Sequence, residues 1–368
     1  MSAATAGTAH RAAAGGRRAG VRDQVDIAVL GGGIIGCLTA REIIRRAPGA
    51  SVLLLDRELV GGGASLRSAG LHIPRGATAA VREMARFSHE HYRKLVQDRP
   101  GLPLRPVAMR VVGTAADEPR LRTDYLPEAE LTATSDLPDE VSLPPGAAAW
   151  SVQGGHYADV AQVTRALTAD LRTDAQIGEA VRVDAVTEHR DGVALRLGTG
   201  EELTAGKVVL APGPWLAAPA WRAMVAPLEA RVKKVVALHV GGRPAPHDAA
   251  VIFEREDAFL LPLPERGHWL FSYTCSEWDV DPDAPSKGLT EHNLHEAREI
   301  LRRHAPAMAA GRLSGRVFCD AYSGTGEPTV RALGDGRVVF AGAANGSGYR
   351  LGPAIAARAA DLLDMGGS

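Results

Sequence analysis

Residues 25–58 read VDIAVLGGGIIGCLTAREIIRRAPGASVLLLDRE, and from this stretch the fold of the first part of the chain can be predicted. Residues 25–30 form an apolar run of the length expected for a strand buried on both faces. Apolar side chains then recur at helical spacing until Pro48 and Gly49, where we expect the helix to end. A second apolar strand follows at residues 52–55, so the order is that of a doubly wound α/β domain.

A glycine pattern lies between the first strand and the helix. Gly31, Gly33 and Gly36 form a G-x-G-x-x-G sequence, in which the first glycine permits a tight turn. The second lets the backbone approach a pyrophosphate, and the third lets helix and strand pack closely. Asp56 lies 20 residues after Gly36, where a carboxylate can accept hydrogen bonds from ribose hydroxyls. Together these features predict a dinucleotide site at the N-terminus of the helix.

The composition limits the classes of protein that need to be considered. The 368 residues are 45% hydrophobic, which is enough for two domains or for one domain with insertions. The net charge of -1 does not favour nucleic acid or an anionic membrane, and no apolar run approaches the ~20 residues of a membrane span. The three cysteines, Cys37, Cys275 and Cys319, show neither a disulfide framework nor metal-ligand spacing. We therefore expect a cytoplasmic protein with no metal and no nucleic-acid partner.

The first part of the chain has a different composition. Residues 1–22 are rich in alanine, glycine and arginine and lack the apolar segment of a secretory signal. We expect them to form a disordered tail that contributes nothing to the fold.

The sequence after Asp56 indicates which dinucleotide is bound. It reads DRELVGGGASLRSAGLHIP, in which residues 63–70 match the pattern G-A-S-x-R-x-x-G. This segment resembles the FAD-dependent D-amino-acid oxidase superfamily, which includes glycine oxidase and sarcosine oxidase. The resemblance implies that FAD is the cofactor and that this segment lies along the flavin. The alternative interpretation of Arg67 is a solvated loop arginine.

Two later segments extend the resemblance. In these oxidases a Gly-x-x-Asp-Pro stretch begins a helix that returns the chain to the FAD domain, and Asp159 fits that place although Val160 replaces the proline. From the residues alone, Asp159 is expected to cap the helix that follows. Residues 207–218, KVVLAPGPWLAA, resemble the family segment that passes the adenosine.

The remainder of the chain is expected to form a second domain. Residues 227–312 contain several alternating apolar and polar stretches, which are typical of an antiparallel sheet with one face toward a cavity, and a helix. The predicted fold class is therefore α/β (α+β overall), with a Rossmann-like FAD-binding domain that is discontinuous in sequence. We assign residues 23–99, 151–226 and 315–368 to the FAD-binding domain and residues 100–150 and 227–314 to the substrate domain.

The sequence near the C-terminus, NGSGYRLGP, predicts a glycine-rich turn that leads into a helix. Gly346 and Gly348 let the backbone lie against a planar ring, and Pro353 suits the first turn of a helix. The resemblance implies that this helix N-terminus points at the pyrimidine end of the flavin, where it stabilises the negative charge of the reduced ring.

Arg350 is the predicted substrate anchor. The sarcosine oxidases have the pattern G-x-G-[FY]-K here, and their lysine holds the substrate carboxylate; this chain has Arg350 at that position. A guanidinium group can bind a carboxylate at two points. The alternatives are a surface arginine and an arginine paired with a structural acid.

Cys319 raises the question of covalent attachment. In sarcosine oxidases a cysteine near this place carries the flavin through a thioether, but the residues around Cys319 match that pattern poorly. Other branches of the superfamily bind FAD noncovalently. Noncovalent binding is therefore favoured, and the alternative interpretation of Cys319 is a small buried core residue.

Three residues of the second domain are further catalytic candidates. Tyr273 and His268 lie on a predicted strand that can face the flavin, although each can also be an ordinary sheet residue. Lys233 and Lys234 alternate on another strand, so only one of them can face inward. We select Lys234 as a candidate for promoting oxygen reduction by its charge.

The implied reaction is oxidation of the C–N bond of an amino acid or N-alkyl amino acid by hydride transfer to flavin N5. The expected partners are a small amine or amino acid that carries a carboxylate, and molecular oxygen, which is reduced to peroxide. Two alternatives remain: a FAD-dependent 2-hydroxy-acid dehydrogenase and a flavin-binding interaction protein without activity. The oligomeric state is not predicted.

The predicted cofactor-binding residues come from all of these segments. They are Gly31, Gly33, Ile34, Ile35, Gly36, Asp56, Arg57, Gly63, Ala64, Ser65, Arg67, Ser68, Ala69, Gly70, Val181, Ala211, Gly213, Trp215, Cys319, Gly342, Gly346, Gly348, Tyr349, Arg350 and Leu351.

Overall fold

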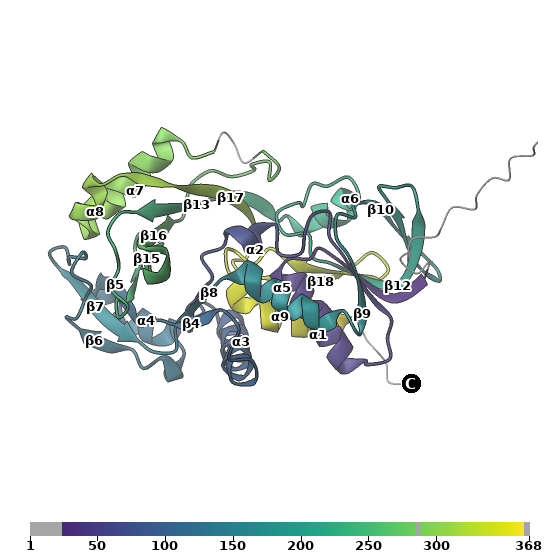
Figure 1. The fold of residues 1–368 in the computed structure, drawn as a ribbon, viewed down its shortest axis with the longest axis horizontal. Coiled ribbons are helices and arrows are strands. Elements are labelled where there is room, and N and C mark those ends of the chain that lie inside the picture. The colour runs from purple at the N-terminus through teal and green to yellow at the C-terminus, as the bar shows by residue number, and fades with distance from the viewer. Residues whose placement is uncertain (1–23, 285–287, 364–368) are drawn as a thin grey trace, which may run out of the picture.

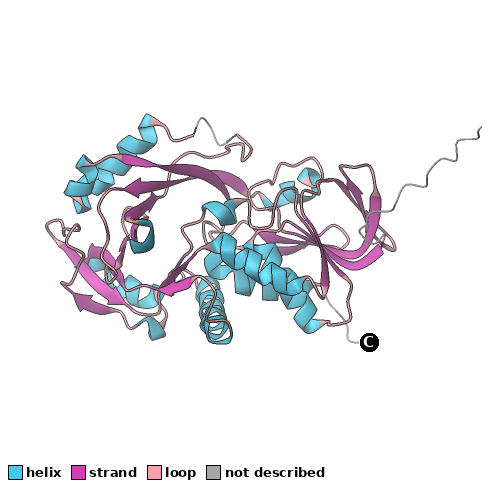
Figure 2. Ribbon diagram, viewed as in Figure 1, coloured by secondary structure: helices cyan, strands magenta, loops and turns pink. Residues whose placement is uncertain are grey.

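The computed structural model describes residues 24–284 and 288–363, so the expected tail at residues 1–22 lies outside the described part. The described chain forms two lobes, each built around an eight-stranded sheet (Figure 1). Helices and strands are mixed in both lobes (Figure 2), and the predicted α/β class is confirmed. None of the helices in the described ranges combines the length and the apolar character that a bilayer crossing requires.

The first sheet has a parallel centre. Its strand order is β10-β11-β12-β1-β2-β9, and β19 pairs with β12 and β18. The strands of this sheet are β1 (Gln24–Leu30), β2 (Val52–Leu55), β9 (Ala175–Gly178), β10 (Val183–His189), β11 (Gly192–Leu197), β12 (Glu202–Leu210), β18 (Thr329–Leu333) and β19 (Val338–Gly342). The predicted strands at residues 25–30 and 52–55 are therefore confirmed, and they are parallel neighbours.

Helices cover this sheet because its parallel strands are apolar on both faces. The helices of this lobe are α1 (Ile34–Arg46), α3 (Ala79–Asp98), α5 (Val160–Leu171) and α9 (Gly348–Leu362); α1 and α9 contact the strands, α3 packs on α9, and α5 packs on α1. The first and last of them pack together over the sheet, and Ile43 and Ile355 are fully buried in their common core. Asp159 caps α5 as predicted, because its side chain accepts a hydrogen bond from the backbone N–H of Gln162.

The second sheet is mostly antiparallel, with one parallel pair, β5 with β14. Its strands are β5 (Met109–Thr114), β6 (Thr132–Thr134), β7 (Ala147–Val152), β13 (Arg231–Val240), β14 (Ala250–Phe253), β15 (Ala258–Leu263), β16 (His268–Tyr273) and β17 (Leu313–Tyr322). Helices α7 (Glu291–His304) and α8 (Pro306–Ala310) pack on one face of it. The other face is turned toward the first lobe, where Leu270 packs near Leu71.

Strand β17 joins the two lobes, because it pairs with β13 along its whole length and its last residues lie beside the glycine-rich turn before α9 (Figure 1). The backbone N–H of Asn345 donates to the carbonyl of Ala321 at 3.2 Å, and Tyr322 bridges to Ala344. The predicted boundary at residues 314/315 therefore lies inside a strand of the second sheet.

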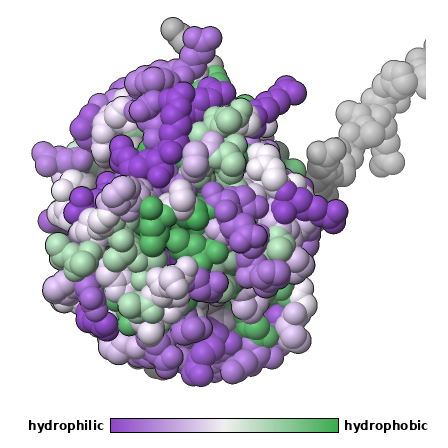
Figure 3. All heavy atoms as spheres, turned by 90° about the vertical axis from the view of Figure 1, so that its left-hand side faces the viewer, coloured by the Kyte–Doolittle hydropathy of each residue, from purple (hydrophilic) through white to green (hydrophobic). Residues whose placement is uncertain are grey.

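Short elements complete the chain. They are α2 (Ala64–Arg67), α4 (Glu118–Asp124), α6 (Arg222–Val225) and a three-stranded sheet of β3 (Leu71–His72), β4 (Leu104–Pro106) and β8 (His156–Ala158). The end of the molecule formed by α8, β6 and β7 carries a small apolar area surrounded by hydrophilic groups (Figure 3).

Pro353 does not lie in the first turn of the last helix, and this expectation was wrong. Helix α9 begins at Gly348, five residues earlier, because the glycine-rich turn itself is helical at its end. A proline has no N–H to donate to the carbonyl four residues before it, which is that of Tyr349. The hydroxyl group of Tyr92 on α3 donates to this carbonyl instead, at 2.6 Å. The first turn of α9 is thus held by a side chain of another helix.

Replacing Tyr92 with phenylalanine should leave the buried Tyr349 carbonyl without a donor. An unsatisfied buried acceptor costs about 1–3 kcal/mol, so we expect the free energy of unfolding to fall by that amount in urea titrations followed by circular dichroism. Tyr157→Phe is the control, because the hydroxyl group of Tyr157 donates to Glu265, whose partly exposed carboxylate can bind water instead. Equal losses in the two variants would contradict this account.

Candidate active site

A cavity of about 1820 Å³ lies between the two lobes, and residues of both sheets line it. Pockets for a single small ligand usually measure about 300–1,000 Å³, so this cavity is large enough for a dinucleotide together with a substrate. The glycine turn after β1, the segment at residues 63–70, the segment after β12 and the turn before α9 all border it. Strands β13 to β17 of the second sheet form the opposite wall.

The glycine turn has no room for side chains. Gly31 has φ +112°, and a Cβ atom built there would lie 2.1 Å from the carbonyl oxygen of Ala211. A Cβ atom at Gly36 would lie 1.8 Å from the carbonyl oxygen of Gly31. The residue before α1, Gly33, has no side chain to cap the helix; the N–H of Ile34 donates to the hydroxyl of Ser65, whereas the N–H groups of Ile35 and Gly36 have no side-chain partner among the described residues. A helix N-terminus that keeps such N–H groups for a ligand, beside a glycine turn, fits a pyrophosphate.

Asp56 stands at the end of β2 beside this turn. One carboxyl oxygen accepts from the N–H of Gly32 at 2.6 Å, and the other accepts from the N–H of Glu58 at 2.7 Å. Burial raises the pKa of Asp56 above its usual value, although these two hydrogen bonds oppose the shift. Each oxygen retains acceptor capacity toward the cavity, which fits a ribose. Val181 lies next to it, because its N–H donates to the backbone carbonyl of Asp56 at 2.8 Å.

An aromatic and ionic cluster closes this end of the cavity. The guanidinium group of Arg57 lies 4.2 Å from the centre of the Trp215 ring. Asp283 forms an ion pair with Arg57 and accepts from the indole N–H of Trp215 at 2.7 Å. Asp283 was not predicted, because it comes from an acidic loop 226 residues farther along the chain and no local pattern distinguishes it.

Arg67 has a different place from the one expected. It does not line the cavity; its guanidinium group donates to the carbonyl oxygens of Gly62 at 3.1 Å and Gly63 at 3.2 Å. Arg316 of β17 in turn donates to the carbonyl of Arg67 at 3.2 Å. Arg67 thus stabilises the loop that borders the cavity by hydrogen bonds, and it is neither a solvated arginine nor a wall residue. Ser65 of the same loop accepts from the N–H of Ile34 at 3.0 Å.

Arg350 lies at the start of α9 and lines the cavity. Its guanidinium group donates to the backbone carbonyl of Arg75 and to the hydroxyl oxygen of Ser347 at 2.9 Å. Within the described ranges no carboxylate forms an ion pair with it. Burial, together with the charge of Arg75, lowers the pKa of Arg350 to about 10. It is therefore neither a surface arginine nor one paired with a structural acid, and a ligand carboxylate would complement it.

The three candidates of the second sheet do not point their polar groups into the cavity. Tyr273 borders the cavity, but it lies among the α7-facing residues and donates its hydroxyl to the carbonyl of Asn293 and to Glu296. His268 is not a wall residue; its ring packs against that of His239, tilted by 37° and with ring centres 4.4 Å apart. Lys234 also borders the cavity, yet its ammonium group pairs with Glu277 at 3.0 Å and its side chain has no exposed surface. Side chains alternate between the two faces of a strand, and the sequence alone does not show which alternate set faces the cavity. That ambiguity explains these differences from the prediction.

Cys319 is also turned away from the cavity. Its neighbours Phe318 and Asp320 line the cavity wall, whereas Cys319 does not. Burial, chiefly, raises the pKa of its thiol to about 11, so the reactive thiolate form is scarce near neutral pH. All three cysteines are free and buried.

Most of the predicted cofactor-binding residues are wall residues of this one cavity. Those that are not are Arg67, Cys319, Gly342 and Leu351. The rest, which do line it, are Gly31, Gly33, Ile34, Ile35, Gly36, Asp56, Arg57, Gly63, Ala64, Ser65, Ser68, Ala69, Gly70, Val181, Ala211, Gly213, Trp215, Gly346, Gly348, Tyr349 and Arg350.

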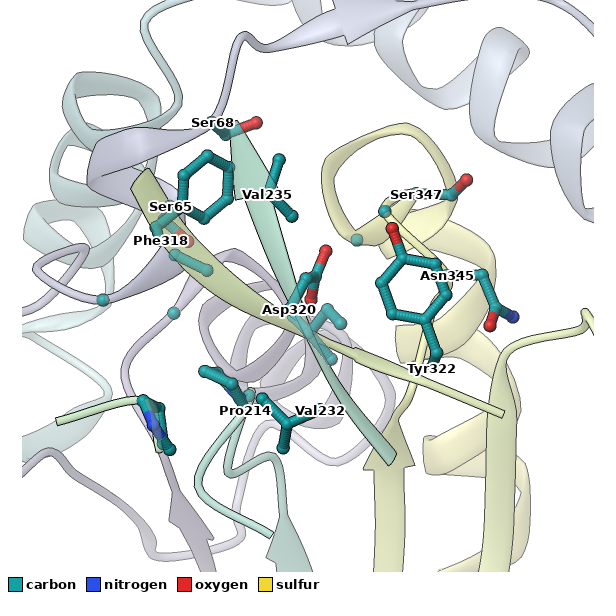
Figure 4. A pocket seen from close by; sticks show the side chains of 18 of the residues that line it. Ser65, Ser68, Pro214, Val232, Val235, Phe318, Asp320, Tyr322, Asn345 and Ser347 are labelled. Carbon is teal, nitrogen blue, oxygen red and sulfur yellow. The ribbon is translucent and has the colours of Figure 1, made fainter. Parts of the chain in front are cut away.

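The sequence interpretation missed Asp320 and Tyr322. Both project from β17 toward the turn that holds Asn345 and Ser347 (Figure 4). The alternation of a strand would have found them, because it places residues 318, 320 and 322 on the face opposite to Cys319. Within the described ranges no group of three histidine, cysteine or acidic residues is arranged to hold a metal ion.

The fold and the cavity together fit a dinucleotide-binding protein whose cavity is closed by a second sheet. The chain belongs to the FAD-dependent oxidoreductase (DAO) family, whose model matches residues 26–362. The predicted family is thus confirmed, and FAD is the cofactor of this family. A comparison with curated proteins found no match to this sequence.

Solved structures with the same fold include several amino-acid-oxidising enzymes. Glycine oxidase from Geobacillus kaustophilus is 18% identical with a TM-score of 0.77, over 94% of this chain and 96% of its own. L-proline dehydrogenase from P. horikoshii is 17% identical with a TM-score of 0.77, over 95% of both chains. The open form of NikD, an unusual amino acid oxidase essential for nikkomycin biosynthesis, is 18% identical with a TM-score of 0.72, over 94% and 95%. At these identities the likeness concerns the fold.

Proposed function

We propose that this protein oxidises the C–N bond of an amino acid or N-alkyl amino acid and passes the electrons to oxygen, with release of peroxide. The observation that carries this proposal is Arg350, a cavity-lining cation without a carboxylate partner among the described residues. A buried guanidinium group without an acidic partner is costly unless a ligand anion meets it. A substrate carboxylate supplies that anion and is held in one orientation by two parallel hydrogen bonds.

The cofactor site supports noncovalent binding of FAD. The glycine turn, Asp56 and the Arg57–Trp215 pair offer complementary contacts to the pyrophosphate, the ribose and the remainder of the adenosine. Cys319 has its thiol away from the cavity wall and its pKa raised, which argues against a thioether. Bound FAD supplies a hydride acceptor, and the chain supplies position and surroundings.

The roles that we assign to the chain follow from the position of each group. Arg350 orients the substrate carboxylate, and the N–H groups at the start of α9 favour negative charge at that end of the cavity. The second sheet forms the opposite wall of the cavity, and its apolar side chains lower the local dielectric, which strengthens both effects. Lys233, whose ammonium group lies 4.6 Å from the centre of the Trp278 ring and 5.4 Å from that of Tyr322, brings a cation near this wall.

The proposal is tested by the visible spectrum of the purified protein under anaerobic conditions. We would add matched pairs: each enantiomer of an amino acid, its N-methyl form and its 2-hydroxy analogue. Bleaching of the flavin band by an amine, followed by peroxide release on adding air, is the expected result. Bleaching by the hydroxy acid alone would favour a 2-hydroxy-acid dehydrogenase, and a colourless protein that binds no FAD would favour an interaction protein.

A further inference from the structure

One acidic side chain of the cavity has no part in the function proposed so far. Asp320 projects from β17 on the same face as Phe318 and Tyr322, and all three line the cavity. In Figure 4 its carboxyl group lies centrally and points in the same direction as the hydroxyl end of Tyr322. A carboxylate on a cavity wall needs compensation for the water that it has lost.

The hydrogen bonds that Asp320 accepts come only from neutral groups. The backbone N–H of Ala321 donates to its carboxyl group at 2.8 Å, and the backbone N–H of Gly346 also hydrogen-bonds to it. No lysine, arginine or histidine of the described ranges forms an ion pair with it. Burial outweighs the two hydrogen bonds and raises the pKa of Asp320 to about 6. The charge is thus present at neutral pH but not neutralised.

Asp320 and Arg350 are attached to the same short turn. The carboxyl group of Asp320 is bound by the N–H of Gly346, and the guanidinium group of Arg350 is bound by the hydroxyl of Ser347, the next residue. The two charged groups do not pair with each other, although both line the same cavity. An anion and a cation that stay apart in one cavity are complementary to a zwitterion that fits between them.

We infer that Asp320 is the site for the ammonium group of a zwitterionic amino-acid substrate and that it takes one proton from that group. This inference rests on the proposed function, because it assigns the second end of the substrate that Arg350 anchors. In the step, an N–H bond of the ammonium breaks, an O–H bond forms on Asp320, and no electrons are transferred. The neutral amine that results has the lone pair needed for loss of the adjacent hydride.

The burial of Asp320 favours this transfer. Desolvation disfavours both the ammonium and the carboxylate, so it lowers the amine pKa while it raises that of the carboxyl group. The transfer turns an ion pair into two neutral hydrogen-bonded groups, which cost less to bury. The titratable group directly opposite Asp320 on β13 is Lys233, whose ammonium group forms no ion pair with Asp320 and lies 5.4 Å from the centre of the Tyr322 ring. Tyr322 on the same face of β17 and Cys319 on the opposite face also interact with Asp320, and burial raises the pKa of both, so neither is charged near pH 7.

The test uses two ligands that cannot be oxidised, because neither has a hydrogen on the carbon beside the carboxylate. They are 2-aminoisobutyrate, a zwitterion, and pivalate, in which a methyl group replaces the ammonium. Binding to the FAD-loaded protein is measured by calorimetry at pH 8 for the wild type, Asp320→Asn and Arg350→Gln. We expect Asp320→Asn to weaken 2-aminoisobutyrate about 10- to 100-fold and pivalate less than about twofold, while Arg350→Gln weakens both.

Two further measurements separate the possible outcomes. The wild-type affinity for 2-aminoisobutyrate should fall as the pH drops through about 6, where Asp320 becomes protonated, and this fall should be absent in Asp320→Asn. If Asp320→Asn changes neither ligand, or both equally, the inference fails while the proposed function stands. A shift of the flavin midpoint potential with unchanged ligand binding would assign Asp320 to the cofactor and overturn the inference. A wild type that binds neither ligand would count against the proposed function itself.

Discussion

Replacing Arg350 with glutamine should lower kcat/KM for an amino-acid substrate by roughly 30- to 5,000-fold, which corresponds to about 2–5 kcal/mol for breaking a buried charge pair. The guanidinium group lines the cavity and lacks a carboxylate partner among the described residues, so nothing on the protein replaces the lost bonds to the substrate. The loss should appear in the rate of anaerobic flavin reduction as a function of substrate concentration.

Two controls isolate the role of the charge. Arg358→Gln lies on the same helix, where the side chain is 39% exposed and only 3.7 Å from Glu83, and it should leave the rate of flavin reduction nearly unchanged. Arg350→Lys keeps the charge but loses the two-point geometry, so its loss should be intermediate. Equal rates for Arg350→Gln and Arg358→Gln would show that the carboxylate is held elsewhere.

Replacing Gly31 with alanine should remove most of the bound FAD. The new Cβ atom would lie 2.1 Å from the carbonyl oxygen of Ala211, and a residue with a side chain rarely adopts φ +112°. To relieve this contact, either the turn or the segment at Ala211 must move, which separates two walls of the cofactor site. Strain of about 1–2 kcal/mol and repacking of about 1–3 kcal/mol together weaken FAD binding roughly 30- to 5,000-fold.

The ratio of flavin to protein absorbance after gel filtration measures this loss directly. Gly49→Ala is the matched control, because a Cβ atom there meets nothing within 4 Å and its φ is not positive. This control should retain the wild-type ratio. Urea unfolding of both apo-proteins shows whether Gly31→Ala acts on the cofactor or on the whole fold. If Gly31→Ala retains full FAD, the turn after β1 does not carry the pyrophosphate.

The parts of the site that the sequence predicts are those made by neighbouring residues. The first strand, the glycine turn, α1 and β2 follow within one segment, so periodicity and spacing locate them within a residue or two. The turn at Gly346 is recognised for the same reason, and Arg350 follows it in the first turn of α9. The glycines of both turns are required by the local backbone, and Arg350 is suited to one adjacent group of the ligand.

The parts that the sequence does not predict depend on contacts between distant segments. The sequence pattern can locate the strands that carry Tyr273 and Asp320. Which side chains of these strands face the cavity is set by their register against the neighbouring strands. Asp283 reaches Arg57 across 226 residues, and Tyr92 meets the Tyr349 carbonyl from another helix. No pattern of one segment reveals such a partner.

The strand order of the first sheet has a consequence for the way the protein is made. Leu30 of β1 pairs with Leu210, and Leu210 pairs with Phe340. Strands β1 and β12 therefore each pair with a strand that is synthesised much later. Such non-local pairing slows folding and leaves apolar strand edges uncovered in the meantime. The walls of the cofactor cavity cannot all be in place before the turn at Gly346 has emerged. We therefore expect the nascent chain to bind FAD only after the turn at Gly346 has been synthesised and has folded against the earlier segments.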